Sequence, residues 1–287
     1  FKDANPLGFI LFARNIESIN QVKELVAELK EICNNPDLLF LIDEEGGRVT
    51  RTNKVFPEKL ASSKQIGDLY QANQEAGLKL LEDTYQEICS RLVQLDLNCC
   101  CTPILDLYFP DADKIIGDRA FAAEPELVIN LANRVISILK ENNILPIIKH
   151  IPGHGRANCD SHLDLPEVDC DLATLKETDF LPFKALAAAP FAMTAHIIFT
   201  ALDPEKPVTL SKKAIAYLRQ EIGYKGLIMT DDLSMKALQG DFATRTKQAI
   251  AAGCDIILHC NGDQDEMIAI NNCLNIKHEL ASAKIKL

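Results

Sequence analysis

The stretch LPIIKHIPGHG, residues 145–155, decides which α/β fold this chain is expected to adopt. It begins as a short, continuously apolar run, which is typical of a strand buried on both faces of a parallel sheet. Lys149 and His150 end that run, and a Pro-Gly turn follows them. An apolar strand that ends in polar side chains is therefore the pattern to seek in the rest of the chain.

The same kind of apolar run recurs along the 287 residues. Further strands are predicted at residues 8–12, 38–42, 97–105, 191–196, 226–230 and 254–260. Amphipathic helices are predicted between them, at residues 18–33, 68–95, 125–142, 173–189, 211–222, 243–252 and 265–277. Regular alternation of buried strands and helices predicts a parallel α/β fold.

Polar residues follow nearly all of these strands, and their placement favours a barrel over an open sheet. They are Asp43, Asp106, His150, His196, Asp231 and Asn261. In a closed barrel the strand ends converge on one face, whereas in a doubly wound sheet they spread along an edge. We therefore predict one domain, residues 1–287, with a (β/α)8 TIM-type barrel. Only seven strands can be counted, so the eighth, N-terminal strand is expected to be missing from this chain.

Composition narrows the class of protein. Apolar residues make up 47% of the chain and charged residues 25%, which allows a large core. The net charge of -11 and the lack of a dense Lys/Arg run argue against a nucleic-acid partner. The longest apolar stretch, residues 185–202, is broken by Pro190 and polar residues, so no membrane span is expected. Consecutive cysteines at residues 99–101 suit a buried strand in a reducing compartment, and we predict a cytoplasmic protein.

Two segments after predicted strands carry candidate ligand-binding charges. LIDEEGGRVTR places Asp43 at a strand end, with Arg51 beyond a Gly-Gly turn that lets the backbone approach a ligand. In the long loop that follows residue 105, Asp118 and Arg119 could hold each other and present a guanidinium to a hydroxyl-rich ligand. The alternatives are a tight turn with solvated charges and an ion pair that only stabilises its loop.

The segment after His150 offers a proton donor. Asp160 precedes His162 by two residues and can accept a hydrogen bond from its ring, which orients the imidazole and favours its protonated form. Such a histidine can act as a general acid near neutral pH. Zinc binding by His150, His154 and His162 is the competing interpretation, but Pro152 disfavours the helix that this spacing would require.

GLIMTDDLSM, residues 226–235, ends a strand with two adjacent carboxylates. One of them can face a pocket, where a desolvated aspartate can act as a covalent nucleophile at a sugar carbon. The alternative role is an N-cap for a following helix. We assign the chemistry to Asp231 and the cap to Asp232.

Five motifs taken together resemble one family. IDEEGGRV, IGDRAF, KHIPGHG, DSH and TDDLSM, in this order and spacing, look like the β-N-acetylglucosaminidases of glycoside hydrolase family 3, single-domain bacterial enzymes of peptidoglycan recycling. The resemblance extends from GFILFARN to AGCDIILHCN, nearly the whole chain. DSH and the lack of room for a second domain distinguish it from the two-domain β-glucosidases of the family. Where family members commonly carry Gln, this chain carries Glu44.

The resemblance implies a retaining exo-β-N-acetylglucosaminidase that uses no metal and no cofactor. It implies that Asp231 is the nucleophile, His162 the general acid/base and Asp160 the partner of His162. It assigns sugar binding to Asp43, Arg51, Arg119, Lys149 and His150. The expected partner is a sugar substrate, a muropeptide containing N-acetylglucosamine, and the expected state is a monomer or weak homo-oligomer.

Three other functions remain open at this point. One is a β-glucosidase or another β-glycosidase on the same fold. Another is a zinc-dependent barrel hydrolase that uses His150, His154, His162 and His196. The third is a sugar-binding protein without catalytic activity.

Overall fold

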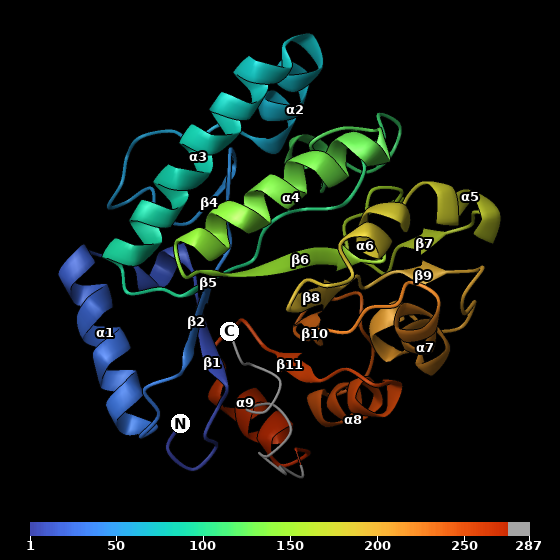
Figure 1. Ribbon diagram of the computed structural model, residues 1–287. Coiled ribbons are helices and arrows are strands. Elements are labelled where there is room, and N and C mark those ends of the chain that lie inside the picture. The colour runs from blue at the N-terminus through green and yellow to red at the C-terminus, as the bar shows by residue number, and fades with distance from the viewer. Residues whose placement is uncertain (275–287) are drawn as a thin grey trace.

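The computed structural model describes residues 1–274 and shows an α/β fold built on a curled parallel sheet (Figure 1). Within these residues, seven strands pair in the order β1-β2-β5-β6-β8-β10-β11. All six neighbouring pairs are parallel. The order in the sheet follows the order in the chain, because connections running over one face carry each strand to the next position.

The strands lie close to the predicted positions. They are β1 (Gly8–Leu11), β2 (Leu39–Ile42), β5 (Cys99–Cys100), β6 (Leu145–Ile151), β8 (Phe191–Thr194), β10 (Leu227–Asp232) and β11 (Ile256–Leu258). The strand predicted at residues 97–105 is much shorter. Pro103 has no backbone N–H to donate to a ladder, and beyond β5 only a single bridge joins Ile104 to Lys149.

Two short pairs of strands lie apart from the main sheet. β3 (Glu44–Gly46) and β4 (Val49–Thr50) form an antiparallel hairpin directly after β2. β7 (Glu167–Val168) and β9 (Ile198–Phe199) pair in parallel. Both pairs belong to segments that follow strands of the main sheet, and the hairpin carries candidate site residues.

Alternate residues of each main strand enter two different apolar cores. In β2, Phe40 and Ile42 pack with the helices, whereas Leu39 and Leu41 face the inside of the curl. The interior cluster consists of Leu39, Leu41, Cys99, Cys101, Leu145, Ile147, Phe191, Met193, Leu227, Met229 and Leu258. Full burial of a side chain of the Leu or Phe size contributes about 1.5–3 kcal/mol. The continuous hydrophobicity of the strands thus reflects burial on both faces, as predicted.

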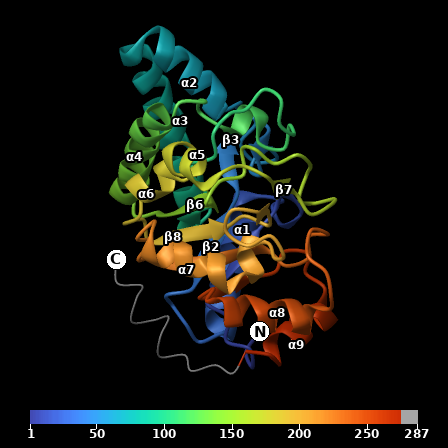
Figure 2. The same cartoon turned by 90° about the vertical axis from the view of Figure 1, so that its right-hand side faces the viewer.

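Helices cover the outside of the sheet (Figure 1). They are α1 (Ile19–Ile32), α2 (Ser63–Ala72), α3 (Gln74–Gln94), α4 (Pro125–Glu141), α5 (Leu172–Glu177), α6 (Leu181–Ala185), α7 (Lys212–Gln220), α8 (Phe242–Ala252) and α9 (Gln264–Asn271). Three short 3-10 helices are η1 (Ala13–Asn15), η2 (Gly117–Arg119) and η3 (Val208–Leu210). Figure 2 shows α2 at one end of the molecule and α8 and α9 at the other.

Three predicted helices differ from those observed. The helix predicted at residues 68–95 is interrupted at Asn73, whose side chain accepts the Ala76 N–H at 3.1 Å and so begins α3. The helix predicted at residues 173–189 is divided into α5 and α6, and Pro182 stands in the first turn of α6, where its missing N–H costs nothing. Of the helix predicted at residues 265–277, the last three residues lie outside the described part.

Within residues 1–274, β1 and β11 pair with no strand on their outer edges. The parallel α/β fold is confirmed, and closure into an eight-stranded barrel stays a prediction. All ten cysteines lie in the described part and none forms a disulfide; those at residues 99–101 are buried. In the same part, no helix combines the length and the apolar character needed to cross a membrane.

Candidate active site

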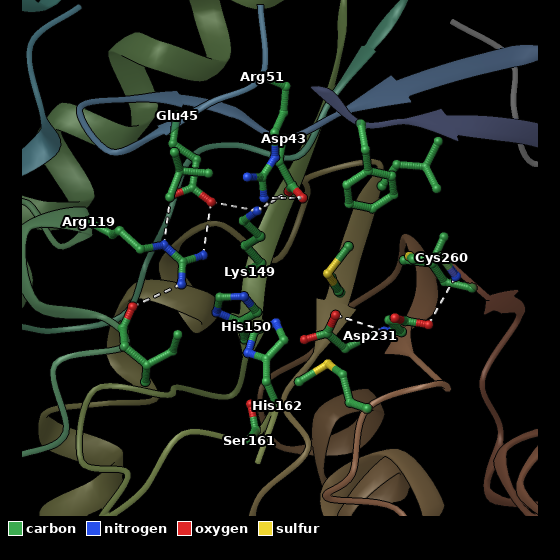
Figure 3. A pocket seen from close by; sticks show the side chains of 18 of the residues that line it. Asp43, Glu45, Arg51, Arg119, Lys149, His150, Ser161, His162, Asp231 and Cys260 are labelled. Carbon is green, nitrogen blue, oxygen red and sulfur yellow. Dashed lines mark hydrogen bonds and ion pairs between the residues drawn. The ribbon is translucent and has the colours of Figure 1, made fainter. Parts of the chain in front are cut away.

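A pocket of about 340 Å³ lies at the carboxyl ends of the strands, within the ~300–1,000 Å³ range of small-molecule sites. Its lining includes most of the predicted site residues, namely Asp43, Arg51, Arg119, Lys149, His150, His162 and Asp231 (Figure 3). Asp160 is not part of the lining but contacts His162. The structure therefore brings together residues separated by up to 188 positions in the sequence, from Asp43 to Asp231.

Three cations and two carboxylates form a compact cluster on one side of the pocket (Figure 3). Lys149 at the end of β6 places its Nζ 2.6 Å from Asp43 and 2.7 Å from Glu45. Arg119 binds both carboxylate oxygens of Glu45, at 2.8 and 2.9 Å. The guanidinium of Arg51 lies 3.7 Å from Asp43. Each charge in this cluster is thus held in place by an opposite one.

Sequence reasoning missed Glu45, although it joins two of these cations. Its position in the β3–β4 hairpin depends on Gly46 and Gly47, whose φ angles of 85° and 54° favour glycine. Burial opposes ionisation of Glu45, but Arg119 and Lys149 outweigh it and hold its pKa well below the usual range. Burial likewise disfavours the charged form of Lys149, yet Asp43 and Glu45 raise its pKa. Glu45 and Lys149 therefore both stay ionised.

The predicted pairing of Asp118 with Arg119 is wrong. Asp118 binds Arg48 at 2.6 Å, and Arg48 also donates to backbone carbonyls of the same loop. Arg119 instead reaches Glu45, which lies 74 positions earlier in the chain. Both arginines therefore tie the loop after β5 to the hairpin after β2, and Arg119 is the one that is largely buried beside Lys149.

A fully buried aspartate, Asp106, holds two histidines. His150 Nδ1 lies 2.7 Å from its Oδ2, and Oδ1 accepts the backbone N–H of His154 at 2.7 Å. Burial opposes ionisation of Asp106, but the bonds to His150 outweigh it and lower its pKa. Burial and the nearby His150 lower the pKa of His154 to about 4, so its ring is neutral at neutral pH. Asp106 was recognised as a polar strand end, but its role could not be assigned from sequence.

Asp231 stands at the end of β10 and lines the pocket. Burial disfavours its carboxylate, but His196 and His150 outweigh it and lower the pKa of Asp231, so the ionised form prevails at neutral pH. Figure 3 shows Asp231 across the pocket from Arg119. A buried, ionised carboxylate that faces a ligand pocket can act as a nucleophile.

Asp232 does not cap a helix, contrary to the sequence prediction. Its Oδ1 accepts the backbone N–H groups of Ser234 and Cys260, at 2.9 and 3.0 Å. The helix that follows, α8, begins ten residues later, at Phe242, and is capped by Asp241. Asp232 thus holds the turn after β10 against the segment after β11, and it lines the pocket beside Asp231.

The loop from Arg156 to Pro166 presents His162 at the rim of the pocket. Asp160 Oδ1 lies 2.8 Å from Nδ1 of His162 and also accepts its backbone N–H at 2.8 Å. Burial opposes ionisation of Asp160, but its bonds to His162 lower its pKa. The imidazole is 60% exposed, and its Nε2 bonds to no group among the described residues. The predicted Asp-His pair is therefore present, with the second ring nitrogen available to a ligand.

Glu44 points away from the pocket and into the protein. Its carboxylate accepts from the Thr52 hydroxyl and the Arg51 N–H, both at 2.8 Å, and lies 4.0 Å from Arg91. Burial raises the pKa of Glu44, although these partners act in the opposite direction. This residue, which departs from the family pattern, therefore supports the backbone beside Arg51.

The histidines of the zinc alternative do not form a ligand set in residues 1–274. In that part of the chain, no three His, Cys, Asp or Glu side chains are arranged to hold a metal ion. His196 is occupied on both ring nitrogens, by the Thr209 hydroxyl at 2.7 Å and the Asp232 carbonyl at 3.1 Å. His196, one of the four histidines that the alternative requires, thus has both ring nitrogens bonded within the protein.

A curled parallel sheet whose carboxyl end gathers carboxylates, cations and histidines in one pocket defines an α/β enzyme domain. Comparison with known proteins gives the family. The family described as "Glycosyl hydrolase family 3 N terminal domain" matches residues 2–286. The chain belongs to glycosyl hydrolase family 3 and is a glycoside hydrolase, which confirms the resemblance seen in the motifs.

Individual relatives support this assignment. A beta-hexosaminidase of Nitrosomonas eutropha is 34% identical over 264 residues, 90% of this chain and 75% of that protein. NagZ from Neisseria gonorrhoeae, solved in complex with N-trifluoroacetyl-D-glucosamine, superimposes with a TM-score of 0.83 at 32% identity, covering 92% of this chain and 77% of the other. A family 3 β-N-acetylglucosaminidase from Paenibacillus sp. gives 0.82 at 32%, covering 97% and 53%.

Proposed function

We propose that this enzyme is a retaining exo-β-N-acetylglucosaminidase. The observation that carries the proposal is the placement of an ionised Asp231 and the Asp160–His162 pair at one pocket, together with a fixed group of hydrogen-bond donors and acceptors. Relatives named beta-hexosaminidase and a similar structure that binds an N-acylated glucosamine support the choice of sugar.

The first chemical step is displacement at the anomeric carbon. The Asp231 carboxylate attacks that carbon while His162 donates a proton to the glycosidic oxygen, so the old C–O bond breaks as a glycosyl-aspartate ester forms. His162 then removes a proton from water as the water attacks the anomeric carbon, so the bond to Asp231 breaks, the carboxylate is regenerated and the sugar leaves with its configuration retained. The Nδ1 bond to Asp160 fixes the orientation of the imidazole and leaves Nε2 as the nitrogen that carries the proton in both steps.

The charged cluster would hold the sugar before the reaction. Asp43, Arg51, Arg119, Lys149 and His150 supply hydrogen bonds suited to hydroxyl groups and to an acetamido carbonyl. Glu45 holds Arg119 and Asp106 holds His150 before any sugar is present. These side chains therefore lose little conformational entropy when the sugar binds. Opposite charges compensate one another across the cluster, which suits a neutral, polar ligand better than an ion.

The wider setting of the enzyme is part of the same proposal. We infer that the sheet closes as a (β/α)8 barrel in one domain spanning residues 1–287, and that the enzyme acts in the cytoplasm as a monomer or weak homo-oligomer. Its substrate would be muropeptides derived from peptidoglycan, from which it releases N-acetylglucosamine. The free cysteines, which suit a reducing compartment, support the location.

Trapping the covalent intermediate tests the proposal directly. A mechanism-based inactivator built on a 2-acetamido sugar should add one sugar mass to the protein, and peptide mapping should locate it on Asp231. The Asp232→Asn variant should still be labelled, because that carboxylate faces backbone N–H groups rather than the sugar. Labelling elsewhere, or faster turnover of aryl glucosides than of aryl N-acetylglucosaminides, would contradict the assignment.

A further inference from the structure

One serine is buried within an otherwise exposed stretch of the loop that carries His162. Ser161 is 2% exposed, whereas the side chains on either side, Asp160 and His162, are 27% and 60% exposed. Leu163, next along the loop, is 68% exposed. A buried residue between exposed neighbours marks the point at which a surface segment is fastened to the protein.

Ser161 makes two contacts that reach different sides of the pocket. Its hydroxyl lies 3.1 Å from Nε2 of His154, in the turn after β6. Its carbonyl accepts the N–H of Ala237 at 3.3 Å, in the segment that follows Asp231 and β10. The loop is thus joined both to the strand that carries Lys149 and His150 and to the strand that carries the carboxylate.

His154 is a rigid anchor for this contact. Its backbone N–H binds Asp106 at 2.7 Å, and its ring is 3% exposed and packs against the ring of His150 with a centroid distance of 5.4 Å. The next residue, Gly155, has no room for a side chain, because a Cβ there would lie 2.1 Å from the carbonyl oxygen of Leu107. The ring of His154 therefore cannot shift freely when the loop moves.

We propose that Ser161 is a positioning residue that fastens the acid/base loop over the pocket through His154 and so sets the placement of His162. This inference rests on the proposed function, in which His162 moves the proton. Ser161 touches neither sugar nor leaving group in this role. It acts because the adjacent residues, Asp160 and His162, share the backbone that the His154–Ser161 contact holds in place.

The effect of removing the hydroxyl should depend on the leaving group. Ser161→Ala should lower kcat about tenfold for an alkyl β-N-acetylglucosaminide, the size expected for losing one buried hydrogen bond that aligns the acid. An activated aryl glycoside needs no proton and should be hydrolysed at nearly the normal rate. Ser137→Ala is the matched control, an exposed serine on α4 with a single hydrogen bond to Asn133.

Two further measurements separate this inference from the proposed function. Amide hydrogen exchange of residues 157–166 should be faster in Ser161→Ala than in Ser137→Ala, irrespective of what His162 does. In a His162→Ala background, the Ser161→Ala change should have no additional effect on either substrate. Three results would overturn the positioning role of Ser161. They are amide exchange in Ser161→Ala that equals that of Ser137→Ala, an equal loss of activity on both substrates in Ser161→Ala, and fully additive losses of activity when Ser161→Ala is combined with His162→Ala. A His162→Ala enzyme that loses both substrates equally would instead contradict the acid/base assignment.

Discussion

Replacing Glu45 by glutamine tests the charged cluster, which has the densest set of ionic contacts in the pocket. Glu45 is 2% exposed and accepts three charge-assisted hydrogen bonds, from Lys149 at 2.7 Å and from Arg119 at 2.8 and 2.9 Å. Glutamine keeps one acceptor oxygen but turns an NH2 group toward a cation. Removing one partner of a buried ion pair costs about 3–5 kcal/mol. Because Asp43 remains 2.6 Å from Lys149, we expect the free energy of unfolding to fall by about 3 kcal/mol, the lower end of this range.

The loss should depend on pH in a defined direction. The pKa of Glu45 is lower in the folded protein than in the unfolded chain, where it is about 4.3. The contribution of Glu45 to the free energy of unfolding is therefore fully present above the unfolded pKa and declines as the pH falls toward the folded pKa. Urea unfolding, followed by circular dichroism, gives the free energy of unfolding of Glu45→Gln and of the unchanged enzyme. The difference between these two free energies should be constant from pH 7 to pH 5 and should decrease below about pH 4.

The adjacent residue, Glu44, provides a matched control, because its pKa is shifted in the opposite direction to that of Glu45. Burial raises the pKa of Glu44, so ionising this carboxyl costs more free energy in the folded protein than in the unfolded chain. Glutamine can still accept from the Arg51 and Thr52 N–H groups. Glu44→Gln should therefore leave the unfolding free energy at pH 7 unchanged or raise it by up to about 1 kcal/mol. Equal losses in both variants, or a Glu45→Gln difference that does not respond to pH, would refute the electrostatic reasoning.

Three other predictions concern turnover, packing and metal. Asp231→Ala should abolish turnover while the circular dichroism spectrum is retained; a normal rate would remove Asp231 from the nucleophile role. Gly155→Ala should destabilise the fold by about 3 kcal/mol in thermal unfolding, because its Cβ would meet the Leu107 carbonyl. Gly223→Ala is the control, because Gly223 has a φ of +78° and open space around it, and this variant should lower the free energy of unfolding by only about 1–2 kcal/mol. Equal losses of unfolding free energy in the two variants would contradict the packing argument. EDTA treatment should leave activity intact, and rescue by zinc after a lasting loss would favour a metal-dependent hydrolase.

Much of the fold could be predicted from the sequence because burial on both faces leaves a direct mark on strand composition. The run that became β6 is apolar up to Lys149, and the parallel order follows from the alternation of strands and helices. Helix ends were harder to predict. The apolar spacing continues through Asn73, where the side chain caps a new helix, so periodicity alone does not show the break.

Most of the residues predicted for the site meet at one pocket, but their partners could not be predicted from the sequence. The strand-end positions of Asp43, Lys149 and Asp231 placed them correctly at one pocket. Arg119 was paired with its neighbour in sequence, whereas its real partner is Glu45, because the fold brings the β3–β4 hairpin beneath the later loop. Contacts made across 74 positions leave no local pattern, and the same is true of the contact between Asp106 and His150, which are 44 positions apart.

The apolar interior beneath the pocket has a consequence for how such enzymes diverge. Ile147 and Met229 fill the interior, while the residues beyond them on the same strands supply the pocket. A lineage can therefore exchange side chains at the strand ends, and with them the sugar that it accepts, while the layer below preserves foldability. Met193 and Leu258 are exceptions because they belong to the interior cluster and also line the pocket, so a substitution at either position changes the packing and the pocket together.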